Sequence, residues 1–258
     1  MSHKLGQVFL KDKNIVSKIL EYSAIVPEDD IVEIGCGDGD LSLDLSEMGK
    51  TLTIYEIDKL CVENTMQYLG ERPNVTYILG DVLEQKMSLK KAKIIANIPY
   101  YISAKIVKWV IAQRECVESA TLMFQKEFAQ KLFASPGEKI YTSLSVYVSY
   151  YLDVEWGFNV SRNSFSPRPK VDSAVIKLIP KQAPFEVNED QFFNMVRSSF
   201  WGRRKKLLTA LKNSPYIQLA PEFSQDPHIG PFQNIRGEIL SLEKFHQLYQ
   251  IIEKYFID

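Results

Sequence analysis

The chain has little cysteine and histidine and no long apolar run among its 258 residues. Cys36, Cys61 and Cys116 are widely spaced and form no C-x-x-C pair, and no histidine lies near them in the sequence. Neither a disulfide framework nor a metal site is therefore expected. Apolar stretches such as residues 94–98 are too short to cross a membrane, and residues 1–10 lack the apolar core of a signal peptide. These absences predict a cytoplasmic protein with no membrane partner and no bound metal.

The chain also lacks a net charge of either sign, because 31 basic residues face 32 acidic ones. The charges are nevertheless unevenly distributed. Residues 1–90 hold 9 basic and 16 acidic groups, whereas residues 162–212 hold 11 basic and 4 acidic groups. A local basic excess of this kind favours contact with a phosphate backbone, although a solvated basic face has the same composition.

The composition is that of a folded protein, and the length suits a main domain with a smaller one. Short apolar runs alternate with helix-like stretches through the first half, which is the order of β-α units in a parallel sheet. The expected strands are residues 31–34, 52–55, 75–79, 93–96 and 120–124, and the expected helices are residues 41–47, 60–69, 104–113 and 126–133. Two further strands, at residues 152–160 and 171–179, would extend the sheet to seven.

The rest of the chain differs in character. Residues 181–184 have the composition of a linker, and helical patterns follow at residues 190–200, 203–211 and 242–255. We therefore predict an α/β fold with a mostly parallel, Rossmann-like sheet in residues 1–180 and a small helical domain in residues 185–258.

A glycine-rich loop, with Gly35, Gly37 and Gly39, lies where the first strand turns into the first helix. Such glycines let a ligand approach the backbone closely. The loop lacks the Lys-Ser/Thr pair of a nucleoside triphosphate site, and its G-x-G-x-G spacing differs from the G-x-G-x-x-G of a dinucleotide site. Asp38 and Asp40 would repel a pyrophosphate, whereas the sulfonium and zwitterionic tail of S-adenosylmethionine tolerate acidic neighbours. The loop therefore favours S-adenosylmethionine as the cofactor.

Two acidic residues follow later strands at the same edge of the expected sheet. Glu56 lies 21 residues after Gly35, where an α/β nucleotide site presents a carboxylate to ribose hydroxyls. Asp81 follows the third strand and could accept a hydrogen bond from the adenine amino group. Each acid could instead be a helix N-cap. Together with the glycine loop, the two acids predict a nucleoside-binding edge.

The fourth strand ends in Asn97-Ile98-Pro99-Tyr100, a sequence suited to one kind of chemistry. An adenine N6 amine is a weak nucleophile because its lone pair is delocalised into the ring. The Asn97 side-chain oxygen and the Ile98 carbonyl could accept the two amine hydrogens. Pro99 would fix the turn, and Tyr100 would stack on the base. Because Asn97 is a neutral acceptor, such a site could transfer two methyl groups in succession, although a plain strand-ending turn is the structural alternative.

Together these residues resemble the bacterial small-subunit (16S) rRNA adenine dimethyltransferases of the KsgA type, which are related to the erythromycin-resistance methyltransferases and to eukaryotic counterparts. The resemblance covers nearly the whole chain. Its blocks are residues 6–10 (GQVFL), 33–37 (EIGCG), 56 (E), 80–81 (GD), 97–100 (NIPY), 124–127 (FQKE), 143–146 (SLSV), 165–175 (FSPRPKVDSAV) and 203–207 (RRKKL). It implies an S-adenosylmethionine-dependent methyltransferase that dimethylates N6 of two adjacent adenosines in a hairpin near the 3′ end of small-subunit rRNA.

The resemblance also implies roles for individual residues. The residues expected to contact the cofactor are Val8, Leu10, Gly35, Gly37, Glu56, Asp81, Val82 and Asn97. Phe165 would flank the target base opposite Tyr100, as flipped bases are commonly held, although a core aromatic is the alternative. Two positions depart from the family pattern. Val8 replaces a usual Asn, which removes a polar contact to the methionine part of the cofactor, and Cys36 replaces a usual Pro.

The basic run Arg203-Arg204-Lys205-Lys206 is expected to start a helix of the small domain and to hold RNA phosphates, with Arg168 and Lys170 as further RNA-binding candidates. Cations that contact only phosphates position RNA without reading its sequence. We therefore expect recognition of a hairpin by its shape, although a solvated helix face is the alternative.

The leading hypothesis is thus a monomeric rRNA adenine dimethyltransferase that acts on immature 30S subunits during ribosome biogenesis. A large-subunit rRNA dimethylase of the antibiotic-resistance type is the nearest enzymatic alternative. A ribosome-assembly factor that has kept the fold and lost turnover is another, which Val8 keeps open. A nicotinamide dehydrogenase is disfavoured by the loop spacing and by Asp38 and Asp40.

Overall fold

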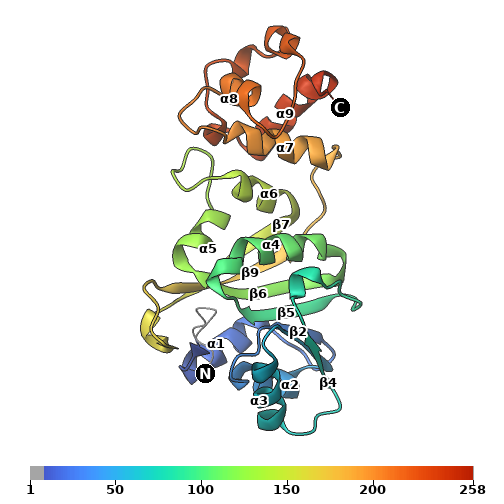
Figure 1. Cartoon of the computed structure of the whole chain (residues 1–258), viewed down its shortest axis with the longest axis vertical. Coiled ribbons are helices and arrows are strands. Elements are labelled where there is room, and N and C mark those ends of the chain that lie inside the picture. Colours follow the sequence, from blue (N-terminus) through green and yellow to red (C-terminus); the bar gives the residue numbers. More distant parts are fainter. Residues whose placement is uncertain (1–8, 258) are drawn as a thin grey trace. The chain divides into compact units, whose positions relative to one another are not determined.

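The computed structural model describes residues 9–257, which form two compact units (Figure 1). The first unit consists of the chain up to Ala129 together with Leu152–Lys181. The second consists of Gln130–Tyr151 and the chain from Gln182 onward. The sequence prediction assigned residues 1–180 to a single domain. In the structure, Gln130–Tyr151 belongs instead to the second unit.

A seven-stranded sheet forms the centre of the first unit. In spatial order its strands are β4 (Val75–Leu79), β3 (Thr51–Glu56), β2 (Asp30–Ile34), β5 (Ala92–Asn97), β6 (Val117–Gln125), β9 (Ser173–Pro180) and β7 (Leu152–Val160). The strands from β4 to β6 pair in parallel, whereas β9 is antiparallel to both β6 and β7. The predicted α/β fold with a mostly parallel, seven-stranded sheet is confirmed.

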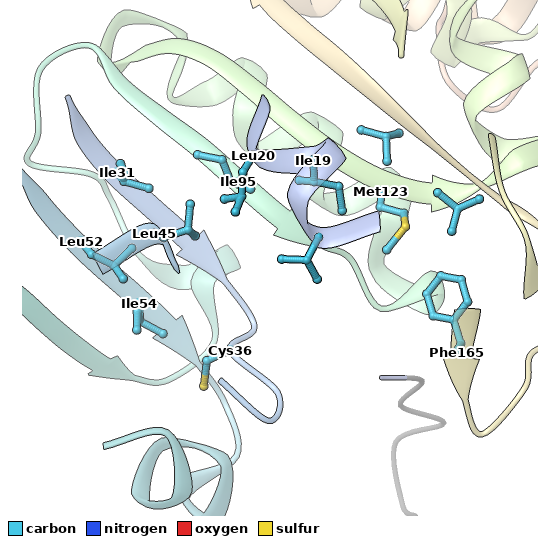
Figure 2. Packing of buried hydrophobic residues seen from close by; sticks show 13 residues of the cluster. Ile19, Leu20, Ile31, Cys36, Leu45, Leu52, Ile54, Ile95, Met123 and Phe165 are labelled. Atoms are coloured by element: carbon cyan, nitrogen blue, oxygen red, sulfur yellow. The ribbon is translucent and has the colours of Figure 1, made fainter. Parts of the chain in front are cut away.

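Helices cover both faces of this sheet. They are α1 (Lys13–Ser23), α2 (Asp40–Met48), α3 (Lys59–Leu69), α4 (Ser103–Ala112) and the start of α5 (Lys126–Leu132). On one face, buried side chains of α1 and α2 pack against alternate residues of the strands, such as Ile31, Leu52 and Ile95, in the cluster shown in Figure 2. On the opposite face, Tyr55 meets Trp109 of α4 edge to face at 6.4 Å.

Two features near the start of the described chain were not predicted. Helix α1 begins after Asp12, whose side chain accepts a hydrogen bond from the Asn14 N–H at 3.0 Å and so caps the helix. The short strands β1 (Phe9–Leu10) and β8 (Phe165–Ser166) pair antiparallel in a separate sheet. Strands of two residues leave no periodic pattern in a sequence, and their pairing joins segments far apart in the chain.

The second unit is helical. Its helices are α6 (Ser143–Tyr151), α7 (Glu189–Ser199), α8 (Leu207–Asn213) and α9 (Leu242–Ile252), with single 3-10 turns at Pro221–Gln225, Gly230–Phe232, Gly237–Ile239 and Glu253–Tyr255. Helix α6 was missed because its sequence is rich in β-branched and aromatic residues, which favour strands. Tertiary packing makes this segment helical. Tyr150 packs against Phe185 and Phe192 of the same unit and donates a hydrogen bond to the Phe185 carbonyl at 2.6 Å.

The helix predicted for residues 203–211 begins only at Leu207. The residues before it form turns around Gly202, which has a φ of 67°, and Lys206 occupies the N-cap position with extended backbone. A left-handed glycine interrupts the helical path of the chain. The basic run therefore precedes the helix instead of forming its first turn.

In the part of the chain that the structure describes, no helix is both long and apolar enough to cross a membrane.

Candidate active site

A cavity of about 390 Å³ opens in the first unit, at the carboxyl ends of β2, β3 and β5. Strands β2 and β5 are neighbours in the sheet but not in the sequence, and α/β sheets bind ligands where the strand order reverses in this way. The cavity lining includes Leu10, Gly35, Cys36, Gly37, Glu56, Asp81, Val82, Asn97, Ile98, Pro99 and Tyr100. Of the described residues predicted to bind the cofactor or to catalyse, only Phe165 is absent from this lining. Val8 lies outside the described residues.

The glycine loop leaves space for a ligand because its backbone adopts conformations that other residues avoid. Gly35 and Gly37 have φ angles of 80° and 54°, in the left-handed region. A Cβ atom on Gly37 would lie 3.2 Å from Cδ1 of Phe9, a cavity residue that sequence reasoning did not identify. The Gly35 N–H donates to the Tyr55 carbonyl at 2.8 Å, which ties the loop to β3.

Glu56 ends β3 and is held in one orientation. Its Oε1 accepts hydrogen bonds from the N–H groups of Ile57 and Asp58 at 2.8 and 2.9 Å. Its Oε2 lies 3.7 Å from Sγ of Cys36, and the residue is 5% exposed. The backbone thus fixes one oxygen, while the second can still accept hydrogen bonds from ligand hydroxyls.

Asp81 combines the two roles that the sequence left open. Its Oδ1 accepts a hydrogen bond from the Leu83 N–H at 2.9 Å and caps the 3-10 turn Val82–Glu84. The residue also lines the cavity. The Gly80 N–H donates to the Glu56 carbonyl at 2.8 Å, so the ends of β4 and β3 are held together. A cap that uses one carboxylate oxygen leaves the other for an amino donor.

Sequence reasoning missed Glu33, an acidic residue of β2 that lines the cavity. Glu33 is 1% exposed, and neither carboxyl oxygen has a hydrogen-bond partner within residues 9–257. A buried carboxyl without partners is costly to ionise. Burial, reinforced by the Glu56 carboxylate, raises the pKa of Glu33 to about 8.

The unpartnered Glu33 carboxyl indicates the kind of ligand the cavity accepts. A cationic group beside it would supply the missing interaction and favour the carboxylate. The signal in the sequence was a charged residue two positions before Gly35, between the apolar residues Val32 and Ile34.

Cys36 stands where the resemblance expects Pro, and its thiol donates to Oε2 of Glu56 at 3.7 Å. The residue is buried in the cluster of Figure 2. Burial is the main cause that raises the pKa of this thiol, and the Glu56 and Glu33 carboxylates add to it. Cys36 is therefore a neutral hydrogen-bond donor that helps to hold Glu56.

The turn after β5 carries two hydrogen-bond acceptors, and both residues that bear them, Asn97 and Ile98, line the cavity. Neither the Asn97 side chain nor the Ile98 carbonyl forms a hydrogen bond with any residue between 9 and 257. The turn itself is fixed, because the Ile98 N–H donates to the Met123 carbonyl at 3.2 Å and the Ile102 N–H donates to the Pro99 carbonyl at 3.1 Å. Two acceptors on a fixed turn match the two hydrogens of an exocyclic amine.

Tyr100 follows on the 3-10 turn Tyr100–Ile102. Its hydroxyl is 3.0 Å from Oγ of Ser173 on β9, and this contact fixes the ring. Burial raises the pKa of the phenol, so the ring is neutral and can stack on a base.

Phe165 is not among the residues that line the cavity, although its strand partner Leu10 is, and its predicted place opposite Tyr100 stays a prediction. Phe165 is 5% exposed and belongs to the buried cluster, where Figure 2 shows it on the side of Met123. In β8 it pairs with Leu10, and the next residue, Ser166, points outward. The alternation of a strand turns Phe165 toward the buried cluster and Ser166 toward solvent.

The charges of the cavity are mainly acidic. Its ionisable lining residues are Glu33, Asp38, Asp40, Glu56, Asp81, Tyr55, Tyr100, Tyr101, Cys36 and Lys105. Asp38 forms an ion pair with Lys11, so its charge repels a phosphate less than the sequence suggested. Buried Glu33 and Glu56 add acidic groups that the sequence argument did not count. The cavity still disfavours a phosphate and favours a cation.

The predicted RNA-binding residues are exposed in their own units. Arg168 and Lys170 belong to the first unit, and the run from Arg203 to Lys206 belongs to the second. Arg203 bonds the Glu238 carboxylate at 3.1 Å and the Tyr141 carbonyl at 3.2 Å. Lys206 donates to the Asn234 side chain at 2.8 Å, so half of the basic run already has partners.

Comparison with known proteins shows the family to which this chain belongs. The family model described as ribosomal RNA adenine dimethylase matches residues 1–254. The chain belongs to this family. It is 38% identical over 264 residues to the ribosomal RNA small subunit methyltransferase A of Lachnoclostridium phytofermentans, with 97% of this chain and 91% of the relative covered.

Solved structures agree with the family. A dimethyladenosine transferase from Plasmodium falciparum is similar with a TM-score of 0.84 and 29% identity, over 97% of this chain and 100% of that one. The 23S rRNA methyltransferase ErmE is similar with a TM-score of 0.71 and 25% identity, over 95% and 99% of the two chains. The protein is thus an rRNA adenine dimethyltransferase that uses S-adenosylmethionine, and the acidic cavity with its unpartnered carboxyl fits that cationic, phosphate-free cofactor.

Proposed function

We propose that this dimethyltransferase modifies N6 of two adjacent adenosines in the 3′-terminal hairpin of small-subunit (16S) rRNA. It would act as a monomer on immature 30S subunits in the cytoplasm, as a step of ribosome biogenesis. Relatives named ribosomal RNA small subunit methyltransferase A support the choice of subunit. The chemistry is carried by one observation, the pair of free acceptors at Asn97 and Ile98 that line the cavity.

The residues of the strand ends would hold the cofactor. Oε2 of Glu56 accepts from the ribose hydroxyls, and the free oxygen of Asp81 accepts from the adenine amino group. Glu33 provides a carboxylate for the cationic part of the molecule. Leu10 and Val82 give apolar contacts from the cavity wall. When bound, the cofactor supplies an electrophilic methyl group on its sulfonium.

Asn97 and Ile98 activate the target. Their two oxygens accept the N6 hydrogens of the flipped adenine, which draws the amine from its planar geometry and localises the nitrogen lone pair. The fixed turn at Pro99 keeps both acceptors in place, so little reorganisation is needed in the transition state. Because both acceptors are neutral, neither retains the N6 proton, which passes to solvent.

Tyr100 positions the base. Its ring is fixed through Ser173 and offers a face for stacking. After the first transfer the monomethylated amine still has one hydrogen and a lone pair, and either acceptor can hold that hydrogen. The same arrangement therefore supports a second transfer to the same nitrogen.

Mass spectrometry of the modified nucleosides tests this function. The purified protein is incubated with methyl-labelled S-adenosylmethionine and either unmethylated small subunits or large-subunit rRNA. We expect N6,N6-dimethyladenosine from the small subunit only, at two neighbouring positions in primer extension. Label in the large-subunit RNA would instead assign the chain to the antibiotic-resistance type. Binding to small subunits without any transfer would make it an assembly factor.

A further inference from the structure

One exposed aromatic residue at the cavity has no role in the chemistry above. Tyr101 follows Tyr100 in the same 3-10 turn, and both line the cavity. Tyr100 is partly buried and bonded to Ser173, whereas 60% of Tyr101 is exposed. The two tyrosines therefore differ in position, with Tyr100 in the cavity and Tyr101 at its mouth.

A lysine accompanies this tyrosine. Lys105 lies four residues after Tyr101, where the 3-10 turn has run into α4, and residues spaced in this way lie on one face of a helix. It is exposed and is the single basic residue of the cavity lining described above. It forms no ion pair with any residue from Phe9 to Ile257.

We propose that Tyr101 and Lys105 bind the nucleotide next to the target adenosine. The Tyr101 ring stacks on the neighbouring base, and the Lys105 ammonium contacts the phosphodiester that joins the two nucleotides. The inference rests on the proposed function, because it needs an RNA in which one base has been flipped into the cavity.

Repulsion by the carboxylates of the cavity is the reason for assigning the phosphodiester to Lys105. Five carboxyl-bearing residues line the cavity, and a phosphodiester among them would meet repulsion in a poorly solvated site. The flipped base is neutral and can enter, whereas its phosphate has to stay outside. Lys105 is the cation of the mouth that can receive it.

Base stacking explains the proposed role of Tyr101. A base that flips out leaves the face of its neighbour without a partner, and this unstacking is part of the cost of flipping. An aromatic ring at the mouth can cover that face, and such stacking restores part of the lost contact. A large purine ring gains most from such contact. The surface therefore favours a target whose neighbour is a purine, a condition that each member of a pair of adjacent adenosines meets.

Binding measurements with modified hairpins test the proposal on the full-length protein. The variants are Tyr101→Ala, Tyr101→Phe and Lys105→Ala. Tyr68→Ala is the matched control, since Tyr68 is 50% exposed in the same unit without lining the cavity. Lys108→Ala, another exposed residue of α4, is the control for the lysine. Each protein is titrated with S-adenosylmethionine, then with an RNA hairpin that carries either a normal or an abasic neighbour beside the target.

We expect Tyr101→Ala to weaken binding of the normal hairpin about 10-fold, a value within the range for one stacked base. The abasic hairpin should bind the wild type and Tyr101→Ala equally, and Tyr101→Phe should behave as wild type. Lys105→Ala should reduce the slope of log affinity against log salt concentration by about one unit, as expected for the loss of one phosphate contact. Cofactor affinity should stay unchanged in all variants.

Three results with the variants would overturn the proposal. One is a Tyr101→Ala protein that binds the normal hairpin as well as Tyr68→Ala does. Another is an equal loss on the normal and abasic hairpins, and the third is a loss of cofactor binding, which would make Tyr101 part of the cofactor site. If the enzyme accepts a large-subunit hairpin instead, the proposed function fails while the same comparison on that RNA still decides the role of Tyr101. A wild type that binds no RNA would overturn both.

Discussion

The cavity of the first unit and the basic run of the second hold their polar groups in opposite ways. In the cavity the groups are buried and fixed, as Glu56 is by two backbone N–H groups. In the basic run the side chains are exposed, and Arg203 and Lys206 already bond other residues of their unit. Fixed dipoles and charges lower a reaction barrier, whereas exposed cations mainly add salt-dependent affinity for RNA. Changes in the two regions should therefore have different consequences.

The largest effect should come from Asn97→Ala. Removing one preorganised acceptor should lower the rate of methyl transfer at saturating substrates by about 10²–10³-fold, the usual loss for such a group. Hairpin binding should stay within about 2-fold of wild type, because the contact strengthens mainly in the transition state. Single-turnover transfer and hairpin titration measure the two quantities, with the exposed Asn163→Ala as control. An equal loss in rate and in binding would contradict the assigned role.

The second-largest effect should be that of Glu56→Gln on cofactor binding. The substitution removes the charge from the hydrogen bonds to the ribose, each of which contributes about 1.5–3 kcal/mol with a charged partner. Converted to a ratio of dissociation constants, this loss corresponds to an affinity for S-adenosylmethionine that is about 10- to 100-fold weaker. Calorimetry measures the change. Glu63→Gln on α3, an exposed residue paired only with Lys59 among those described, is the control. Unchanged affinity would show that the ribose is held elsewhere.

Glu33 should make cofactor binding depend on pH. Its pKa is raised to about 8 in the folded protein, whereas an unfolded Glu ionises near pH 4.3. A cationic ligand favours the carboxylate, so binding should release a proton, and affinity should rise with pH up to about pH 8, by at most 10-fold per unit. Calorimetry in buffers of different ionisation enthalpy counts the proton. Glu33→Gln should abolish the release, and a wild type that releases none would disprove the assignment.

The same pKa has a consequence for stability without cofactor. Between about pH 4.3 and pH 8 the folded state binds the Glu33 proton and the unfolded state does not, so the free energy of unfolding should fall as the pH rises through this range. Thermal melting of wild type and Glu33→Gln would show the difference, which should vanish below that range.

The smallest effects should come from the basic run, and its residues should not all behave alike. Arg204→Ala and Lys205→Ala should each weaken hairpin binding a few-fold and reduce the salt slope by about one unit, as expected for single phosphate contacts. Arg203→Ala should also lower the melting temperature, because it removes bonds to Glu238 and Tyr141. If all three variants melted as wild type does, Arg203 would have no structural part and the run would act as one surface.

Much of the cavity could be predicted because the carboxyl ends of parallel strands share one edge of a sheet. The glycine loop, Glu56 and Asn97 each follow a strand with a clear apolar pattern, so their meeting followed from the β-α order alone. Phe165 could not be placed in this way. Its strand has two residues, and its inward direction depends on a pairing with β1 that leaves no local pattern.

Packing explains the remaining differences. Helix α6 has a sequence that favours strands and is helical because its aromatic side chains meet those around α7. Glu33 was overlooked because an acidic residue in a strand suggests an exposed position, and only the fold shows its carboxyl to be buried and unpartnered. In both cases distant parts of the chain determine the outcome.

The thiol beside Glu56 bears on how this enzyme could be inhibited. Alkylation and oxidation of cysteine proceed through the thiolate. Burial raises the pKa of Cys36 far above its ordinary value, and burial together with nearby carboxylates raises that of Cys61 to about 11. Both thiols therefore remain protonated at neutral pH. An electrophilic compound aimed at Cys36 would therefore react slowly, and inhibitors of this site gain more from contacts with its acidic edge.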